Sequence, residues 1–191
     1  MFEERKINPE LQKRYREHGY WKEETLLDCW ERAVEQFPDR EYVVDDRGYR
    51  YTYRELDEAA GRVASYLAWL GIRPGEVVSF QIPIWREFAM LTIACYKVGA
   101  VAHPIAMSYE EKELVRSLNV TESRCYFGPT FFYKTDYENR ILSVREQVPL
   151  LKDIVLIDSV TPRKSSVRLL REILDSFEPL PKKQCVHTKN G

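Results

Sequence analysis

The sequence has 191 residues, of which 44% are hydrophobic and 31% are charged, and its formal net charge at pH 7 is −1. This composition is that of an ordinary globular chain long enough to bury one core, so it excludes the disordered and fibrous classes. The near-neutral charge gives the chain no overall electrostatic reason to approach nucleic acid or an anionic membrane.

Targeting signals and cysteine chemistry are not indicated. The first residues, Met1 to Lys6, are too charged to form the apolar core of a signal peptide. The longest apolar run, around Phe88 to Tyr96, is roughly half of the ~20 residues that a membrane-spanning helix needs. The four cysteines are far apart and form no C-x-x-C pair, so they indicate neither a zinc site nor a redox motif. We therefore expect a cytoplasmic protein without a membrane span.

Residues 1–40 are predicted to be an N-terminal helical lead-in. A helix is expected from about Thr25 to Gln36, because apolar residues recur there at helical spacing. The segments Glu41 to Val44 and Tyr49 to Tyr53 flank the turn sequence Asp45-Asp46-Arg47-Gly48. They are predicted to pair as a hairpin on the edge of a sheet.

Residues 41–178 are predicted to form an α/β subdomain. Thr52 and Glu55 have the spacing of a capping box and mark the start of a helix that Gly71 ends. Ser108 and Glu111 repeat that spacing before a later helix. Strands are expected at Glu76 to Ile82, Ala100 to Ile105, Arg124 to Phe127 and Ile154 to Asp158, and helices at Trp85 to Val98, Ser108 to Leu118, Thr135 to Gln147 and Val167 to Phe177.

The alternation of strands and helices predicts the fold class. A helix between two strands implies a right-handed crossover and therefore parallel pairing. We expect an α/β fold with an open, mainly parallel sheet, helices on both faces and the N-terminal hairpin at its edge. Residues 179–191 hold Pro179 and Pro181 with lysines and no apolar period, so they are predicted to be a linker-like tail.

In an open parallel sheet, ligands bind beyond the carboxyl ends of the strands, in the strand-to-helix turns. Each of these turns contains a proline, namely Pro83, Pro104 or Pro129. Proline removes a backbone N–H group and fixes φ, whereas a phosphate cradle needs successive free N–H groups. The turns are therefore expected to be pocket walls, and no residue is predicted to be catalytic, to bind a cofactor or to bind a metal.

His103 lies on or just past a predicted strand end, where it could act as a base or contact a substrate. No serine, cysteine or carboxylate has a spacing that ties it to His103 in a catalytic arrangement. A structural histidine is therefore the favoured interpretation.

Four segments carry a resemblance to a known family. The sequence Tyr51-Thr52-Tyr53-Arg54-Glu55-Leu56 resembles the "T-Y-x-E-L" helix entry of the AMP-forming acyl- and aryl-acid ligases, which include the acyl-CoA synthetases. Tyr96 to Ile105 resembles their "K-x-G-A-x-x-x-P" segment. Gly71 to Gly75 is similar to their "G-x-x-x-G-D-x-V", with Glu76 in place of the aspartate. Tyr15 to Trp21 is similar to the lead-in of members that activate aryl acids. The likeness spans about Tyr15 to Asp158.

The resemblance implies a function for a longer parent enzyme. Such a ligase joins a carboxylic acid to ATP, forms an acyl-adenylate and pyrophosphate, and passes the acyl group to coenzyme A or a carrier thiol. It uses magnesium, a Ser/Thr/Gly-rich loop for the triphosphate and a lysine from a mobile C-terminal domain. Aryl acids, medium-chain fatty acids and larger acids such as bile acids are all compatible substrates.

No Ser/Thr/Gly-rich loop with a lysine occurs before Gly191. The ATP-loop region and the C-terminal domain of the parent are therefore expected to be absent. We interpret the chain as an N-terminal fragment of such a ligase that is catalytically silent on its own. ATP, magnesium and coenzyme A would be cofactors of the parent and not of this chain, whose partner is the remainder of the parent polypeptide.

Two other interpretations stay open. The chain could be a stand-alone α/β module that binds a small acid or nucleotide in a crevice near His103 and Met107. It could also be an interaction protein that docks through an exposed apolar edge, since aromatic residues cluster near Phe131.

Overall fold

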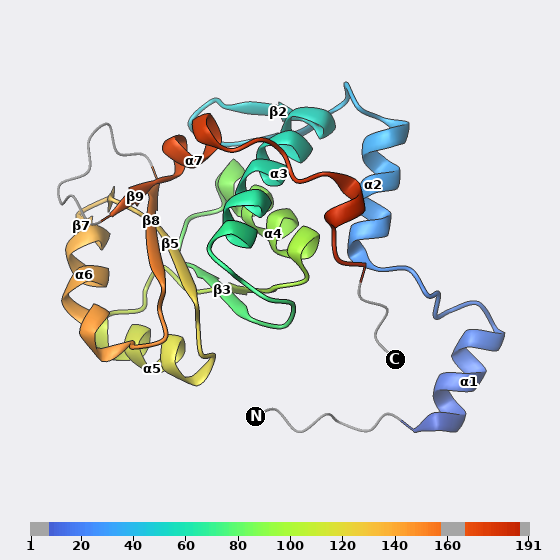
Figure 1. Cartoon of the computed structure of the whole chain (residues 1–191), viewed down its shortest axis with the longest axis horizontal. Coiled ribbons are helices and arrows are strands. Elements are labelled where there is room, and N and C mark those ends of the chain that lie inside the picture. The colour runs from blue at the N-terminus through green and yellow to red at the C-terminus, as the bar shows by residue number, and fades with distance from the viewer. Residues whose placement is uncertain (1–7, 158–166, 188–191) are drawn as a thin grey trace.

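The computed structural model describes residues 8–157 and 167–187, and its centre is a five-stranded sheet in which every strand pair is parallel. Its strands are β3 (Val77–Phe80), β4 (Val101–Pro104), β5 (Cys125–Pro129), β8 (Asp153–Ile157) and β9 (Arg168–Leu169). Their order in space is β4-β3-β5-β8-β9. The predicted α/β fold with an open, mainly parallel sheet is confirmed (Figure 1).

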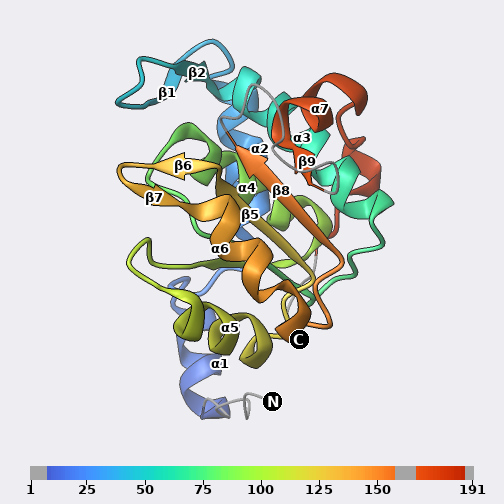
Figure 2. The same cartoon turned by 90° about the vertical axis from the view of Figure 1, so that its left-hand side faces the viewer.

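Helices cover both faces of the sheet (Figure 2). One face carries α3 (Tyr53–Trp69), α4 (Arg86–Val98) and α7 (Leu170–Ser176), and the other carries α5 (Glu111–Val120) and α6 (Tyr137–Val144). Alternate strand residues point to opposite faces. Phe127 and Val155 accordingly belong to the core under α3 and α4, whereas Tyr126 and Ile154 belong to the core under α5 and α6. Both faces are buried, which explains why β5 is apolar without alternation.

The start of α3 follows the predicted capping box. The backbone N–H of Glu55 donates to Oγ1 of Thr52 at 3.3 Å, and the backbone N–H of Thr52 donates to Oε2 of Glu55 at 2.8 Å. The prediction of a second capping box at Ser108 and Glu111 is wrong. Helix α5 begins at Glu111, and Glu110 occupies the N-cap position without a side-chain hydrogen bond. The backbone N–H of Tyr109 donates to the carbonyl of Ala106 instead, so Ser108 lies inside a preceding turn.

The N-terminal part contains α1 (Pro9–Glu17), α2 (Leu26–Gln36) and the predicted hairpin, β1 (Glu41–Val44) and β2 (Arg50–Thr52). Thr25 and Asp28 form a capping box at the start of α2. Within the described residues, β1 and β2 pair only with each other, so the hairpin is a separate two-stranded sheet. Figure 2 shows it above the carboxyl ends of the parallel strands.

Several short elements differ from the predicted ones. The helix expected from Thr135 to Gln147 is preceded by a small hairpin, β6 (Phe131–Phe132) and β7 (Thr135–Asp136), and ends in a 3-10 turn, η1 (Arg145–Gln147). The helix expected from Val167 begins only at Leu170, because Arg168 and Leu169 pair with β8. Asp158, at the end of the strand predicted from Ile154, lies outside the described residues.

The described end of the chain, residues 178–187, lies along the helices and contains the 3-10 turn η2 (Lys182–Gln184). We call these residues the C-terminal strap. The backbone N–H of Leu180 donates to the carbonyl of Gly61 at 3.0 Å, and that of Val186 donates to the carbonyl of Lys97 at 2.8 Å. Nζ of Lys182 lies 2.6 Å from a carboxylate oxygen of Glu35. The strap therefore joins α2, α3 and α4, and its role as a linker to a further domain stays a prediction.

Replacing Gly99 with alanine is expected to destabilise the fold by about 1–3 kcal/mol. Gly99 ends α4 with φ of +69°, where a Cβ is disfavoured, and that Cβ would lie 2.9 Å from Cγ1 of Val186 and 3.2 Å from Cβ of Pro74. Urea unfolding measures the loss. The double variant Gly99→Ala/Val186→Ala is expected to recover part of it, and no recovery would contradict the proposed contact with the strap.

Candidate functional site at the carboxyl edge of the sheet

The strand order defines where a ligand site belongs. Numbered along the chain, the five strands lie in the order 2-1-3-4-5, so the direction of winding reverses between β3 and β5. Ligands of open α/β sheets bind outside the carboxyl ends of the strands near such a reversal. Trp85, just after β3, packs edge-on against Phe132, just after β5, with ring centroids 5.5 Å apart. These two rings cover part of the carboxyl edge between β3 and β5.

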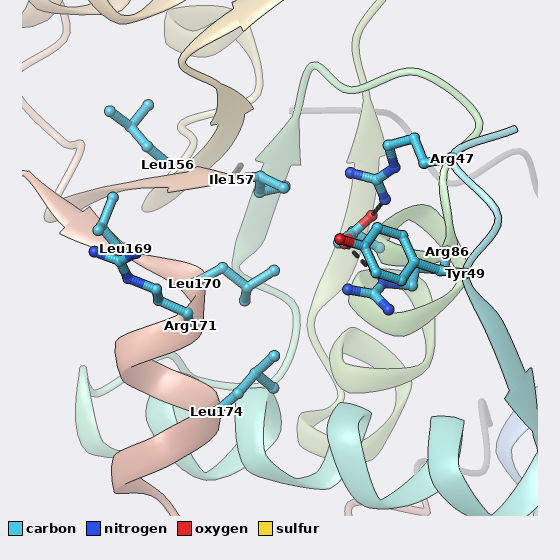
Figure 3. A pocket seen from close by; sticks show the side chains of 10 residues that line it. Arg47, Tyr49, Arg86, Leu156, Ile157, Leu169, Leu170, Arg171 and Leu174 are labelled. Carbon is cyan, nitrogen blue, oxygen red and sulfur yellow. Dashed lines mark hydrogen bonds and ion pairs between the residues drawn. The ribbon is translucent and has the colours of Figure 1, made fainter. Parts of the chain in front are cut away.

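A cavity of about 430 Å³ lies at the same edge (Figure 3). One wall is polar and comes from the β1–β2 loop and the start of α4, and the other is aliphatic and comes from the ends of β8 and β9 and from α7. The polar wall consists of Arg47, Tyr49, Arg86 and Glu87, and the other wall consists of Leu156, Ile157, Leu169, Leu170, Leu174 and the stem of Arg171.

A network of charges builds the polar wall. Nη2 of Arg47 donates to Oδ2 of Asp45 at 2.8 Å and to Oε2 of Glu87 at 2.5 Å. Nε of Arg86 donates to Oε1 of Glu87 at 3.1 Å. Glu87 is only 2% exposed, and its ion pairs with these two arginines offset the cost of burying a carboxylate. The network also fixes the β1–β2 loop on α4, which a two-stranded hairpin needs because it is marginally stable alone.

Aromatic rings hold the two guanidinium groups in place. The Arg86 guanidinium lies 3.6 Å from the ring centroid of Tyr49, and that of Arg47 lies 4.1 Å from the ring centroid of Trp85. Stacking of this kind orients the planar arginine fork and adds attraction where water is partly excluded.

The pKa of Asp45 lies below its ordinary value of 3.8. Burial alone would raise the pKa, but hydrogen bonds from the Arg47 side chain and from the backbone N–H groups of Tyr49 and Arg86 outweigh it. A carboxyl whose pKa is lower in the folded state stabilises the fold above its unfolded pKa, and that stabilisation is lost as pH falls through the folded pKa.

The stability of the chain is therefore expected to fall on acidification below the ordinary aspartate pKa of 3.8, and less steeply in the variant Asp45→Asn. Urea midpoints measured between about pH 7 and about pH 3 give the two slopes. Asp46→Asn, which changes a neighbouring carboxylate, is the matched control and should keep the slope of the unmodified chain. Equal slopes for all three proteins would contradict the assignment.

His103 lies away from the cavity. The Ser79 hydroxyl oxygen is 2.8 Å from its Nδ1 and the Ser117 hydroxyl oxygen is 3.4 Å from its Nε2. Burial lowers the pKa of the ring. His103 thus bridges β3 and α5, as a structural histidine would. The loop that holds Met107 is fixed too, since the Tyr137 hydroxyl donates to the Met107 carbonyl at 3.0 Å.

Two charged residues of the segments that resemble the ligase family, Lys97 and Glu76, make structural contacts. Lys97 is 2% exposed, and its Nζ lies 2.8 Å from Oδ1 of Asp57, which also accepts from Nε1 of Trp30 at 2.7 Å. Glu76 lies at the amino edge, where it accepts from the backbone N–H of Arg73 at 2.8 Å and pairs with Arg124 at 3.2 Å. The glutamate thus fixes the turn before β3 and reaches the guanidinium group of Arg124, which directly precedes β5.

The turns at the carboxyl edge do not fit a triphosphate. The backbone N–H of Gln81 donates to the carbonyl of Phe127, that of Trp85 to Pro83 and that of Thr130 to Ile157. These groups are used within the protein, and the prolines supply none. The part of the chain that the structure describes also contains no group of three or more His, Cys, Asp or Glu side chains that could hold a metal ion.

The aromatic residues near Phe131 lie on the β6–β7 hairpin. Phe131 is 49% exposed and Tyr133 is 85% exposed, whereas Phe132 packs on Trp85.

Across the described helices, none combines the length and apolar character required to cross a membrane.

Comparison with known proteins identifies the family of the chain. The sequence pattern of the AMP-binding enzyme family matches residues 30–184, and the chain belongs to this family. A medium-chain fatty-acid–CoA ligase of Escherichia coli is 38% identical over 170 residues, which cover 89% of this chain and 30% of the relative. A 2,3-dihydroxybenzoate–AMP ligase of Bacillus subtilis is 29% identical and covers 77% of this chain and 27% of the relative.

The solved structures show the same fold. The apo structure of MbtA from Mycobacterium smegmatis superposes with a TM-score of 0.76 at 24% identity, covering 95% of this chain and 33% of that protein. An acetoacetyl-CoA synthetase from Streptomyces lividans gives a TM-score of 0.71 at 21% identity. The chain thus spans about 30% of the length of the E. coli relative and lies within an acid-ligase family, as the sequence resemblance implied.

Proposed function

We propose that this chain is the N-terminal part of an ATP-dependent carboxylic acid–thiol ligase that acts through an acyl-adenylate, and that it is catalytically silent alone. The observation that carries the proposal is the combination of a family match over residues 30–184 with coverage of only about a third of the relatives. We favour coenzyme A as the acceptor, because the relative with 38% identity is a CoA ligase.

The turns at the carboxyl edge support the proposed lack of catalytic activity. Its turns use their backbone N–H groups internally, so the described residues do not fit Mg·ATP. ATP, magnesium and coenzyme A are accordingly assigned to the whole enzyme, which we place in the cytoplasm. In this chain, the parallel sheet and the polar wall act as a scaffold against which the remainder of the polypeptide packs.

Calorimetric titration of the chain with Mg·ATP and with coenzyme A tests the proposal against the alternative of a stand-alone nucleotide-binding module. We expect no heat of binding at millimolar ligand. Micromolar affinity for either ligand would favour the module. The coding frame gives an independent test, since a Ser/Thr/Gly-rich loop with a lysine is expected within a few dozen residues after Gly191.

A further inference from the structure

We propose that a second cavity, between α2, α4 and the β1–β2 hairpin, is a binding site for an uncharged aromatic molecule. The cavity has a volume of about 410 Å³, which is within the range of small-molecule sites. It shares no lining residue with the cavity at the carboxyl edge. The proposal goes beyond the proposed function, because it assigns a separate ligand site to this chain itself.

Aromatic rings from three helices and one strand line this cavity. Trp30 of α2, Tyr42 of β1 and Tyr53 of α3 pack on one another, with ring centroids between 4.8 and 5.4 Å apart. Phe88 and Tyr96 of α4 contribute two further rings. A flat aromatic ligand can join such a group through edge-to-face and offset contacts, which stabilise a complex beyond the burial of area. An aliphatic ring of the same size lacks these contacts.

Small side chains leave the space between the rings. Ala33 of α2 and Ala89 of α4 both line the cavity, as does the buried side chain of Ile93. An alanine at these positions leaves room that a larger side chain would fill. Ala33 is therefore a position at which a substitution can close the site from the side of α2.

The charge of the lining favours an uncharged ligand. None of the described residues that line the cavity has a charged side chain. The nearby Arg32, whose Nη2 lies 3.6 Å from Sγ of Cys29, already pairs with Glu24 at 2.8 Å. A carboxylate or ammonium group buried without a partner is costly. The hydroxyl groups of Thr92 and Tyr96 can instead hydrogen-bond a neutral polar group such as a phenol.

Contacts within the protein hold the walls in place. The indole N–H of Trp30 donates to Oδ1 of Asp57 at 2.7 Å. The ring of Phe88 packs edge-on against Phe80 of the central sheet, with centroids 5.2 Å apart. A ligand would therefore find the aromatic walls already ordered, so that binding would cost little conformational entropy.

Titration calorimetry with 2-naphthol, 2-naphthoate and 2-decalol tests the ligand class on the chain as it exists. We expect 2-naphthol to bind with one-to-one stoichiometry, at least about tenfold more tightly than 2-naphthoate, whose carboxylate would meet no charged partner. 2-Decalol keeps the hydroxyl group and the fused rings but has no aromatic face, so it should bind at least about threefold more weakly than 2-naphthol. Equal affinity for 2-naphthol and either analogue, or no binding of 2-naphthol at millimolar concentration, would overturn the proposal.

A filling variant locates the ligand. Ala33→Phe is expected to weaken 2-naphthol binding by about tenfold, because the new ring occupies the space between α2 and α4. Ala68→Phe, at an exposed position of α3 that does not line the cavity, is the matched control and should bind as the unmodified chain does. Unchanged affinity in Ala33→Phe, with thermal melting showing a folded protein, would contradict the location.

The thiol of Cys29 gives a second measurement that needs no substitution. Cys29 is exposed and lines the cavity, whereas Cys185 is half-buried and does not line it. Saturating 2-naphthol is expected to slow the alkylation of Cys29 by iodoacetamide several-fold and to leave that of Cys185 unchanged, as measured by mass spectrometry of the peptides. Equal rates at Cys29 with and without 2-naphthol would contradict the site.

Sedimentation distinguishes this ligand from an aromatic side chain of a second copy of the chain. Tyr20 and Trp21 are exposed and could fill such a cavity in a dimer. We expect a monomer, and a dimer that binds no 2-naphthol would overturn the proposal.

The outcome is separable from that of the proposed function. Pyrophosphate exchange and nucleotide binding report on the ligase machinery, whereas 2-naphthol binding reports on this second cavity. Binding of 2-naphthol without binding of a nucleotide is the combined result that we expect.

Discussion

Replacing Asp57 with alanine is expected to destabilise the chain by about 3–5 kcal/mol, because it leaves the ammonium group of Lys97 buried without its partner. Lys97 is 2% exposed and its Nζ lies 2.8 Å from Asp57. The change also removes the acceptor of the Trp30 indole N–H. Urea unfolding followed by circular dichroism measures the loss.

The double variant Asp57→Leu/Lys97→Met is the matched control. It removes both charges and replaces each side chain with an apolar one of similar shape, and replacing a buried ion pair by apolar groups is often nearly neutral. We therefore expect it to be clearly more stable than Asp57→Ala. If the single variant were as stable as the unmodified chain, Lys97 would have to be solvated, which would contradict the structure.

Replacing Glu87 with alanine is expected to cost about 3 kcal/mol or more and to loosen the β1–β2 hairpin. Glu87 joins Arg47 of the hairpin loop to Arg86 of α4, and its removal takes the shared carboxylate from both guanidinium groups. Hydrogen exchange should therefore accelerate in β1 and β2 more than in β5, beyond the general loss of stability.

Glu113→Ala on α5 is the control for Glu87→Ala, since Glu113 is an exposed glutamate in the first turn of a helix and has no link to the hairpin. It should change the unfolding free energy by no more than about 0.5 kcal/mol. Faster exchange spread evenly over the sheet after Glu87→Ala would show that Glu87 does not fasten the hairpin specifically.

The long elements were predictable because their signals are local. Thr52 and Glu55 are three residues apart and make the expected contacts, and the apolar period of α3 fixes which face is buried. The strands β3 and β5 are apolar runs between turn residues, as buried parallel strands are. These features together predicted the fold class.

The missed elements are short or depend on distant partners. A two-residue strand such as β6 or β9 has no periodicity, and it forms only because a neighbour offers hydrogen bonds. Ser108 has the right spacing for a capping box, yet the turn closed by Tyr109 takes precedence.

The cavity could not be predicted because its walls are far apart in the sequence. Arg47 and Glu87 are 40 positions apart, and Asp45-Asp46-Arg47-Gly48 has the composition of any hairpin turn. One signal for the C-terminal strap was available in principle. Gly61 is unfavourable in the interior of a helix, and a Cβ there would lie 2.9 Å from Cβ of Pro179, so the glycine marks where another segment approaches closely.

ATP–pyrophosphate exchange tests the central claim most directly. The purified chain is incubated with ATP, magnesium, labelled pyrophosphate and in turn octanoate, 2,3-dihydroxybenzoate and salicylate, with the E. coli medium-chain fatty-acid–CoA ligase as the positive control. We predict exchange by the control and none above background by the chain, since its carboxyl-edge turns do not fit the triphosphate. Acid-dependent exchange by the chain alone would contradict its assignment as the catalytically silent N-terminal part of a ligase.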